Sequence, residues 1–168
     1  MKIISWEQDF LYTKGQHRQL KRVEFVSDRV SYIDLRGRWC NIIVLNVYAP
    51  SEEKSDEAKD SFYEELEQVF YDFPKYHMKI QLGDFNTKVG RENILKPTIG
   101  NQSLYQHSND NCVRIVTFAT SKNLVIKSIM FPHQNIHKYT WTSPDGKIHN
   151  QIDHILIDRR WHSRILHV

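Results

Sequence analysis

A short polar motif follows an apolar segment in the middle of this chain. Met78–Leu82 is expected to form a short strand, and Gly83 is then followed by Asp84, Phe85 and Asn86. Aspartate, asparagine and glycine are common in turns, so a simple turn is the plainer interpretation of these residues alone. In α/β sheets, however, binding and catalytic groups lie in loops at the carboxyl ends of strands. A carboxylate and an amide two positions apart therefore also predict a site.

Two further stretches carry polar groups that an ordinary strand would not select. They are Asn46–Pro50, which reads NVYAP, and Gln151–Ile155, which reads QIDHI. With Gly83–Thr87 (GDFNT), they resemble the endonuclease/exonuclease/phosphatase superfamily, and within it the apurinic-type endonuclease domain of RTE-clade non-LTR retrotransposons. The similarity starts near Lys21 and is carried by KRVEFVSDRVSYI, RGRWCNIIVLNVYAPSEEKS, FYEELEQVF and TWTSPDGKIHNQIDHILIDRRW. Residues 1–20 do not resemble the family, so residues 21–168 are expected to be the central and C-terminal part of such a domain.

The resemblance implies a magnesium-dependent centre that cleaves phosphodiester bonds, with Mn²⁺ as a possible substitute. Such chemistry needs an activated water, a hard cation with oxygen ligands, and hydrogen-bond donors for the phosphate. By resemblance, Asp84 orients or deprotonates the water and contributes indirectly to the metal site. Asn86 and Tyr48 hydrogen-bond the scissile phosphate, and Thr140 places a hydroxyl near the substrate. Asp153 matches the acid that orients a catalytic histidine.

Each of these residues also has a simpler interpretation. Tyr48 alone is more often an aromatic residue at a strand end, and Thr140 is common in strands. Asp153 and His154 are adjacent, so strand alternation places them on opposite faces, and His154 is expected to be structural. Trp141 is expected to lie in the core rather than to stack on a base.

Some parts of the family pattern are not found in this sequence. These are a first strand with a catalytic asparagine, a strand with the metal-binding glutamate, and a terminal Ser-Asp-His motif. The chain is therefore expected to be the middle of the domain, with little or no activity alone, because catalytic groups act as a unit. Loss of the first strands also predicts an exposed apolar sheet face, open sheet edges and poor solubility.

The chain is expected to fold as an incomplete α/β layered sandwich of the deoxyribonuclease-I-like type, with two mixed sheets and outer helices. Apolar spacing predicts helices over 55–73, capped by Ser51 or Ser55, and over 113–122, with Asn123 as a C-terminal cap. Strands are expected over 30–35, 39–48, 78–82, 124–131, 138–142 and 149–157. Gly37 is expected to take a positive φ in a hairpin turn.

Composition is ordinary for one globular domain of 168 residues, with 40% hydrophobic and 26% charged residues. A net charge of +3 permits a polyanionic partner without requiring one. Neither Cys40 nor Cys112 has zinc-ligand spacing, and Cys40 is expected to be buried. No signal peptide or membrane span is expected, so the protein is predicted to be nuclear or cytoplasmic and not secreted.

Three functions are open at this point. The first is a magnesium-dependent DNA endonuclease of retrotransposon origin, impaired by the missing groups. The second is an inactive remnant that at most binds nucleic acid or a protein. The third is a phosphatase of the same fold that acts on a small phosphoester or a lipid. The flanking sequence favours the nuclease over the phosphatase, while the protein partner and the oligomeric state stay open.

Overall fold

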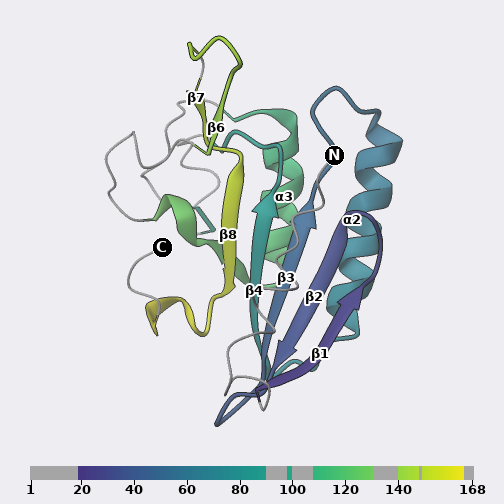
Figure 1. Ribbon diagram of the computed structural model, residues 1–168, viewed down its shortest axis with the longest axis vertical. Helices are drawn as coiled ribbons and strands as arrows, with labels where there is room; N and C mark the ends of the chain where they lie inside the picture. The colour runs from purple at the N-terminus through teal and green to yellow at the C-terminus, as the bar shows by residue number, and fades with distance from the viewer. Residues whose placement is uncertain (1–18, 90–97, 100–107, 131–139, 148, 165–168) are drawn as a thin grey trace.

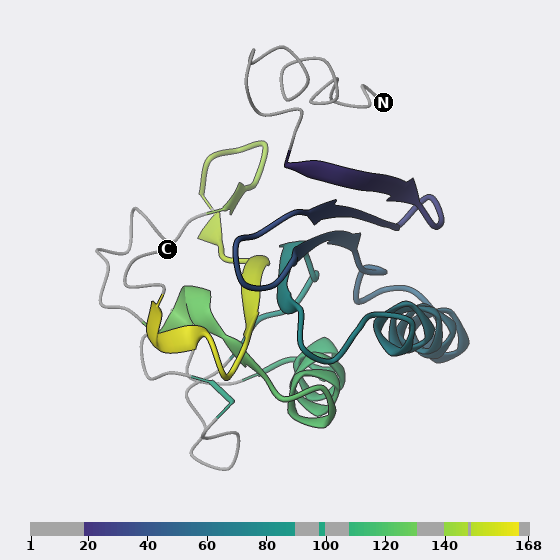
Figure 2. The ribbon, with the colours of Figure 1, turned by 90° about the horizontal axis from the view of Figure 1, so that it is seen from below.

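A six-stranded mixed sheet with two helices on one face forms the body of the chain. The computed structural model describes residues 19–89, 98–99, 108–130, 140–147 and 149–164. The strands of the large sheet, in spatial order, are β1 (Leu20–Phe25), β2 (Val30–Leu35), β3 (Ile42–Tyr48), β4 (Met78–Asp84), β8 (Asp153–Asp158) and β5 (Leu124–Ile126). The helices α2 (Asp56–Tyr71) and α3 (Asp110–Ser121) lie side by side against one face of it (Figures 1 and 2).

A second, two-stranded sheet stands at one end of the first. It consists of β6 (Trp141–Thr142) and β7 (His149–Asn150), which pair antiparallel. Within the large sheet, β3 and β4 are parallel and all other neighbouring strands are antiparallel. The short 3₁₀ helices η2 (Lys127–Ile129) and η4 (His162–Arg164) follow β5 and β8. A large mixed sheet, a small second sheet and outer helices confirm the predicted fold class.

Helix α2 forms where the apolar spacing predicts it. The Ser55 hydroxyl caps the helix by accepting a bond from the Ala58 amide, and Asp56 and Glu57 complement the positive helix N-terminus. The buried apolar side chains of the helix are Phe62, Leu66, Val69 and Phe70. They cover the sheet face that carries Ile43 and Leu45 of β3.

Helix α3 starts at Asp110, three residues before the predicted start. It ends as predicted, because Asn123 takes a left-handed conformation with φ of 55° just beyond it. Phe118 packs edge-to-face against Phe70 of α2, with ring centroids 5.3 Å apart. The two helices therefore form one layer.

Several strand boundaries differ from the predictions. The segment 149–157 is divided between β7 and β8, and the described part of the predicted strand 124–131 forms β5 and then η2. β3 begins only at Ile42, so Trp39 is 84% exposed and Cys40 is only partly buried. Residues 1–18, and the first two residues of the predicted strand 138–142, lie outside the described residues.

β1 was not predicted, although it pairs with β2 along its length. Its sequence, LKRVEF, places three charged residues among apolar ones and so hides the alternation. Val23 and Phe25 pair with Ile33 and Ser31, which puts them on the face away from the helices. They are 41% and 59% exposed, as an edge strand with one uncovered side requires.

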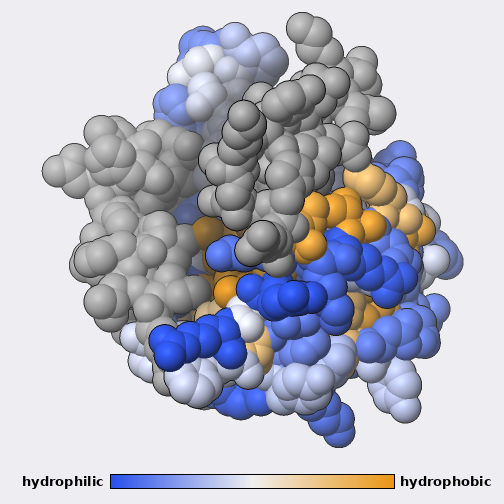
Figure 3. All heavy atoms as spheres, turned by 60° about the horizontal axis from the view of Figure 1, so that its bottom comes forward, coloured by the Kyte–Doolittle hydropathy of each residue, from blue (hydrophilic) through white to orange (hydrophobic). Residues whose placement is uncertain are grey.

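The sheet face away from the helices is partly open in the described structure. Residues from β2, β3 and β4 line a mostly apolar groove of about 370 Å³, namely Ser31, Tyr32, Ile33, Leu35, Val44, Asn46 and Leu82. Apolar and hydrophilic surface also alternate on the side of the molecule seen in Figure 3. The groove and the exposed β1 residues agree with the predicted uncovered face, while poor solubility stays a prediction.

Gly37 is required for space and not for a positive φ, which corrects the prediction. A Cβ at this position would lie 2.0 Å from the Cys40 carbonyl oxygen.

Among the described residues, no helix combines the length and apolar character that crossing a membrane requires.

Candidate active site

Three of the predicted site residues lie in one row across adjacent strands. Tyr48 at the end of β3 pairs with Asp84 at the end of β4, and Asp84 pairs with Asp153 at the start of β8. Paired residues of neighbouring strands project on the same face of a sheet, so the three side chains lie side by side. This face is the one away from α2 and α3, at the carboxyl ends of the parallel strands.

Asp84 lies at the centre of the row. Burial raises the pKa of its carboxyl, a hydrogen bond from the Asn86 amide opposes this, and the nearby Asp153 charge raises the pKa further. The Asn86 amide donates to Asp84 Oδ1 over 2.7 Å. Two neighbouring carboxylates that repel one another favour a bound cation or a proton at this point.

The Asn86 side chain does not follow the regular alternation of β4. β4 ends at Asp84, and Asn86 has a left-handed conformation with φ of 47°, so simple strand alternation does not align the two. The Asn86 Nδ2 donates to the Ala49 carbonyl over 2.8 Å, which ties the motif to the end of β3. The bond to Ala49 thus uses one of the two hydrogens of the Asn86 side-chain amide. Phe85, which separates Asp84 from Asn86 in the sequence, is fully buried.

Arg29 is a cation beside the row that sequence reasoning missed. Its guanidinium lies over the Tyr48 ring, 5.5 Å from the centroid, and its Nη1 donates to the Tyr48 carbonyl over 3.2 Å. Tyr48 itself is 54% exposed. No local motif marks Arg29, since it lies in the turn between β1 and β2 and only strand pairing brings it to Tyr48.

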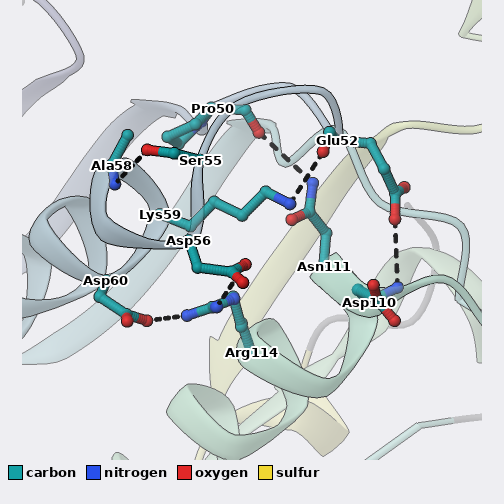
Figure 4. A network of polar contacts seen from close by, with 10 residues as sticks. All are labelled: Pro50, Glu52, Ser55, Asp56, Ala58, Lys59, Asp60, Asp110, Asn111 and Arg114. Atoms are coloured by element: carbon teal, nitrogen blue, oxygen red, sulfur yellow. Dashed lines mark hydrogen bonds and ion pairs between the residues drawn. The ribbon is translucent and has the colours of Figure 1, made fainter.

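The loops around the row are fixed by a polar network that was also missed (Figure 4). Asn111 of α3 is 98% buried, and its Nδ2 donates to the carbonyls of Pro50 (3.3 Å) and Asn86 (3.0 Å). Lys59 of α2 donates to the Glu52 carbonyl over 2.8 Å. The Glu52 carboxylate accepts a bond from the amide of Asp110 at the start of α3. The network joins the segment after β3, the segment after β4 and both helices.

Ion pairs between the two helices complete this network. Arg114 of α3 pairs with Asp56 and Asp60 of α2, as Figure 4 shows. Asn109 adds bonds to the loop after β4, because its Oδ1 accepts from the Thr87 hydroxyl and from the Lys88 amide. The sequence signal for this role was weak, since asparagine before a helix is common as a cap.

Thr140 lies next to the row but its hydroxyl oxygen supports the backbone. Oγ1 accepts bonds from the amides of Ile152 (3.0 Å) and Asp153 (3.2 Å), where β8 begins. Its neighbour Trp141 is 41% exposed on β6, so the prediction that this ring lies in the core was wrong. β6 pairs only with the short β7 among the described strands, so no core forms there.

Curated proteins with similar sequences are known for this chain. No family model matches the sequence. The chain is 33% identical to craniofacial development protein 2 of Bos taurus over 139 residues, which is 83% of this chain and 23% of that protein. It is 32% identical to craniofacial development protein 2 of Tragulus javanicus over 83% of this chain and 24% of that protein.

Solved structures show the fold. The endonuclease domain of TRAS1, a telomere-specific non-LTR retrotransposon, superimposes with a TM-score of 0.56 at 13% identity, over 86% of this chain and 56% of that chain. The AP endonuclease LMAP from Leishmania major gives a TM-score of 0.57 at 14% identity, over 83% and 50%. The chain therefore shares the fold of these two structures. It spans about a quarter of the length of its curated relatives.

The superfamily resemblance raises the question of a metal. Asp84 and Asp153 are hard oxygen donors, and Mg²⁺ in proteins is typically held by one or two carboxylates with waters and substrate phosphates. The residue types present therefore fit this ion. Among the described residues, no group of three or more histidine, cysteine, aspartate or glutamate side chains is placed to hold a metal.

His154 lies on the opposite face of β8 from Asp153, as alternation predicts. It is 99% buried, its Nε2 lies 3.3 Å from the Thr87 carbonyl, and its Nδ1 lies 3.1 Å from the Ser128 hydroxyl. Since a carbonyl can only accept, Nε2 must carry the proton of the neutral ring. Burial lowers the pKa of His154 to about 4, and the bond to Thr87 opposes this shift.

We expect stability to fall between about pH 6.5 and pH 4 because of His154. The unfolded ring binds a proton near its ordinary pKa of 6.5, whereas the folded ring resists protonation until about pH 4. The full contribution is present above pH 6.5, and about 3 kcal/mol is lost as pH falls through this window. Chemical denaturation at several pH values measures it. His154→Asn should flatten the profile, whereas the exposed control His149→Gln should not; equal profiles for all three proteins contradict the assignment.

Proposed function

We propose that this chain carries part of a magnesium-dependent endonuclease centre that cleaves phosphodiester bonds in DNA. The observation that supports this most is the row of Tyr48, Asp84 and Asp153 on three adjacent strands. This row lies at the carboxyl ends of the parallel strands β3 and β4, which is where α/β sheets bind ligands. The nuclease names of the solved structures with this fold support the same activity.

The residues of the row would divide the work as follows. Asp84 orients the attacking water and accepts its proton, for which a raised pKa suits a carboxylate. Tyr48 donates its hydroxyl to the scissile phosphate, and Asn86 donates the amide hydrogen that the Ala49 bond does not use. Arg29 adds positive charge beside them. A bound Mg²⁺, or Mn²⁺, would supply Lewis acidity and charge neutralisation.

Asp153 and Thr140 have supporting roles in this proposal. Thr140 fixes the backbone of Asp153 through its hydroxyl oxygen, and its hydroxyl hydrogen is left for a phosphate oxygen. Asp153 places a second carboxylate beside Asp84 and would orient a catalytic histidine if one were supplied.

We further propose that the protein is located in the nucleus or the cytoplasm, where DNA or its intermediates are present.

An inactive remnant that binds nucleic acid without cutting it is the second candidate. It is favoured by the described donor set, in which no third acidic, histidine or cysteine side chain joins the two aspartates as a metal ligand. Both candidates predict DNA binding, but only the first predicts strand cleavage.

Nicking of supercoiled plasmid with Mg²⁺ or with EDTA tests the proposal. We expect slow nicking that EDTA abolishes and that Tyr48→Phe slows by roughly 10- to 100-fold, since one phosphate donor is lost. Tyr71→Phe is the matched control, because Tyr71 is 85% exposed on α2 and should leave the rate unchanged.

The other results separate the alternatives. A folded protein that binds DNA without nicking it would establish the remnant. Chelator-sensitive hydrolysis of a small phosphomonoester without plasmid nicking would establish a phosphatase. Equal loss of nicking in the Tyr48 and Tyr71 variants would remove Tyr48 from the centre.

A further inference from the structure

A second cavity lies at the end of the sheet opposite to the row of Tyr48, Asp84 and Asp153. Its volume is about 620 Å³, within the usual range of small-ligand sites. Lys79, at the start of β4, lines this cavity, whereas Asp84 ends the same strand. Five residue-to-residue steps along an extended chain separate the two by roughly 16 Å. Figure 1 shows β8 running away from β6 and β7 toward this end of the sheet.

Cationic side chains dominate the described lining of this cavity. Four line it, namely Lys75, Lys79, Lys122 and Arg160, against one carboxylate, Asp158. Arg160 Nε donates to Asp158 Oδ1 over 3.0 Å, and Lys122 pairs with Glu67 at 3.4 Å. After these two pairs are set aside, the charges of Lys75 and Lys79 remain. The cavity therefore favours an anion.

Lys79 is the buried member of this set. It is 93% buried, and its Nζ donates to the carbonyls of Pro74 (2.9 Å) and His77 (3.2 Å). These bonds use two of the three hydrogens of the ammonium group. Burial lowers the pKa of Lys79, while the charge of Asp158 raises it. A bound anion would further favour the charged form of this lysine.

An aromatic wall borders the same cavity. It consists of Phe70, Tyr71 and Phe73, at the C-terminal end of α2 and just beyond it. Phe70 and Phe73 are buried, whereas Tyr71 is 85% exposed and presents its ring to solvent. An exposed ring beside a cationic cavity suits a ligand that joins a planar base to a phosphate.

We propose that this cavity binds a nucleotide phosphate, with the phosphate between Lys75 and Lys79 and the base against Tyr71. The ligand is a free mononucleotide or one nucleotide of a single strand, since both present the same groups. Binding here is separate from the proposed cleavage and needs no divalent metal.

An NMR titration of the ¹⁵N-labelled chain in EDTA tests this proposal. We expect AMP to bind saturably with a Kd of roughly 0.1–1 mM. The shifts should centre on the amides of Tyr71, Lys122 and Asn123 and leave those of Asp84 and Asn86 unchanged. Adenosine and inorganic phosphate, each offering one half of the ligand, should bind at least ~10-fold more weakly.

Variants distinguish a site from general attraction. Lys75→Glu and Tyr71→Ala change exposed side chains and should each weaken AMP binding by roughly 10-fold. Lys54→Glu, an exposed lysine in the segment between β3 and α2, is the charge-matched control and should have no effect. A trinucleotide that binds much more tightly than AMP assigns the site to a strand, and equal affinity assigns it to free nucleotides.

Three results would overturn the proposal. They are no saturation by ~10 mM AMP, shifts centred on Asp84 and Asn86, and equal weakening by Lys54→Glu and Lys75→Glu. None of these depends on whether the plasmid is nicked, so this proposal and the cleavage centre fail or survive separately.

Discussion

Replacing Gly83 with alanine is expected to unfold the chain or bring it close to unfolding. Gly83 has a φ of +140°, a backbone conformation that residues other than glycine rarely adopt. It pairs with Val47 of the parallel strand β3. A Cβ at this position would lie 2.0 Å from the Val47 carbonyl oxygen and 3.0 Å from its carbonyl carbon and amide nitrogen. All three atoms are backbone and cannot rotate away. The expected loss is about 4 kcal/mol or more, a large part of the stability of a domain.

Gly146→Ala is the matched control for this effect. Gly146 also has a positive φ, of 71°, but a Cβ there meets no heavy atom within 4 Å. It should cost only about 1 kcal/mol, the usual penalty of a left-handed conformation. Urea denaturation compares both variants with the parent chain. A Gly83→Ala protein as stable as Gly146→Ala would mean that β3 and β4 do not approach this closely.

Asp84→Asn is expected to abolish nicking while making the fold more stable. Burial and the nearby Asp153 raise the pKa of Asp84 above its ordinary value of 3.8. The stability therefore falls as pH rises through the two pKa values, because the folded state disfavours the carboxylate. An amide removes this cost at neutral pH, and its oxygen still accepts the bond from the Asn86 amide. The proposed water-activating group is lost, so nicking should fall at least ~100-fold.

Two measurements together test this expectation. Thermal denaturation at pH 7 should give a higher midpoint for Asp84→Asn than for the parent, and plasmid nicking should fall to the EDTA level. Glu64→Gln removes one exposed charge from α2 and should change neither. Retained nicking in Asp84→Asn would exclude Asp84 from the chemistry. A lower midpoint would show that the carboxylate is needed for folding.

Much of the fold was predictable because its signals are local. The Ser55 cap and the spacing from Phe62 to Phe70 determine α2, and Asn123 marks the end of α3. Resemblance over the three polar motifs predicted the fold, which the solved structures confirm. The edge strand β1 was missed, because its stability comes from pairing with β2 and not from its own pattern.

The candidate site was predictable in its residue types but not in its arrangement. The motifs around Tyr48, Asp84 and Asp153 are visible in the sequence, yet only the register of β3, β4 and β8 places them in one row. Arg29 could not be found because it belongs to no motif and reaches Tyr48 through strand pairing.

The local elements and the chemical groups of this protein could be predicted, because caps, apolar spacing and residue types act over a few positions. Tertiary structure alone decided which groups meet, because contacts between distant segments depend on strand register and packing. Asn111, far along the chain, holds the carbonyl of Asn86, and Trp141 is left exposed because no neighbouring layer of the described chain covers it.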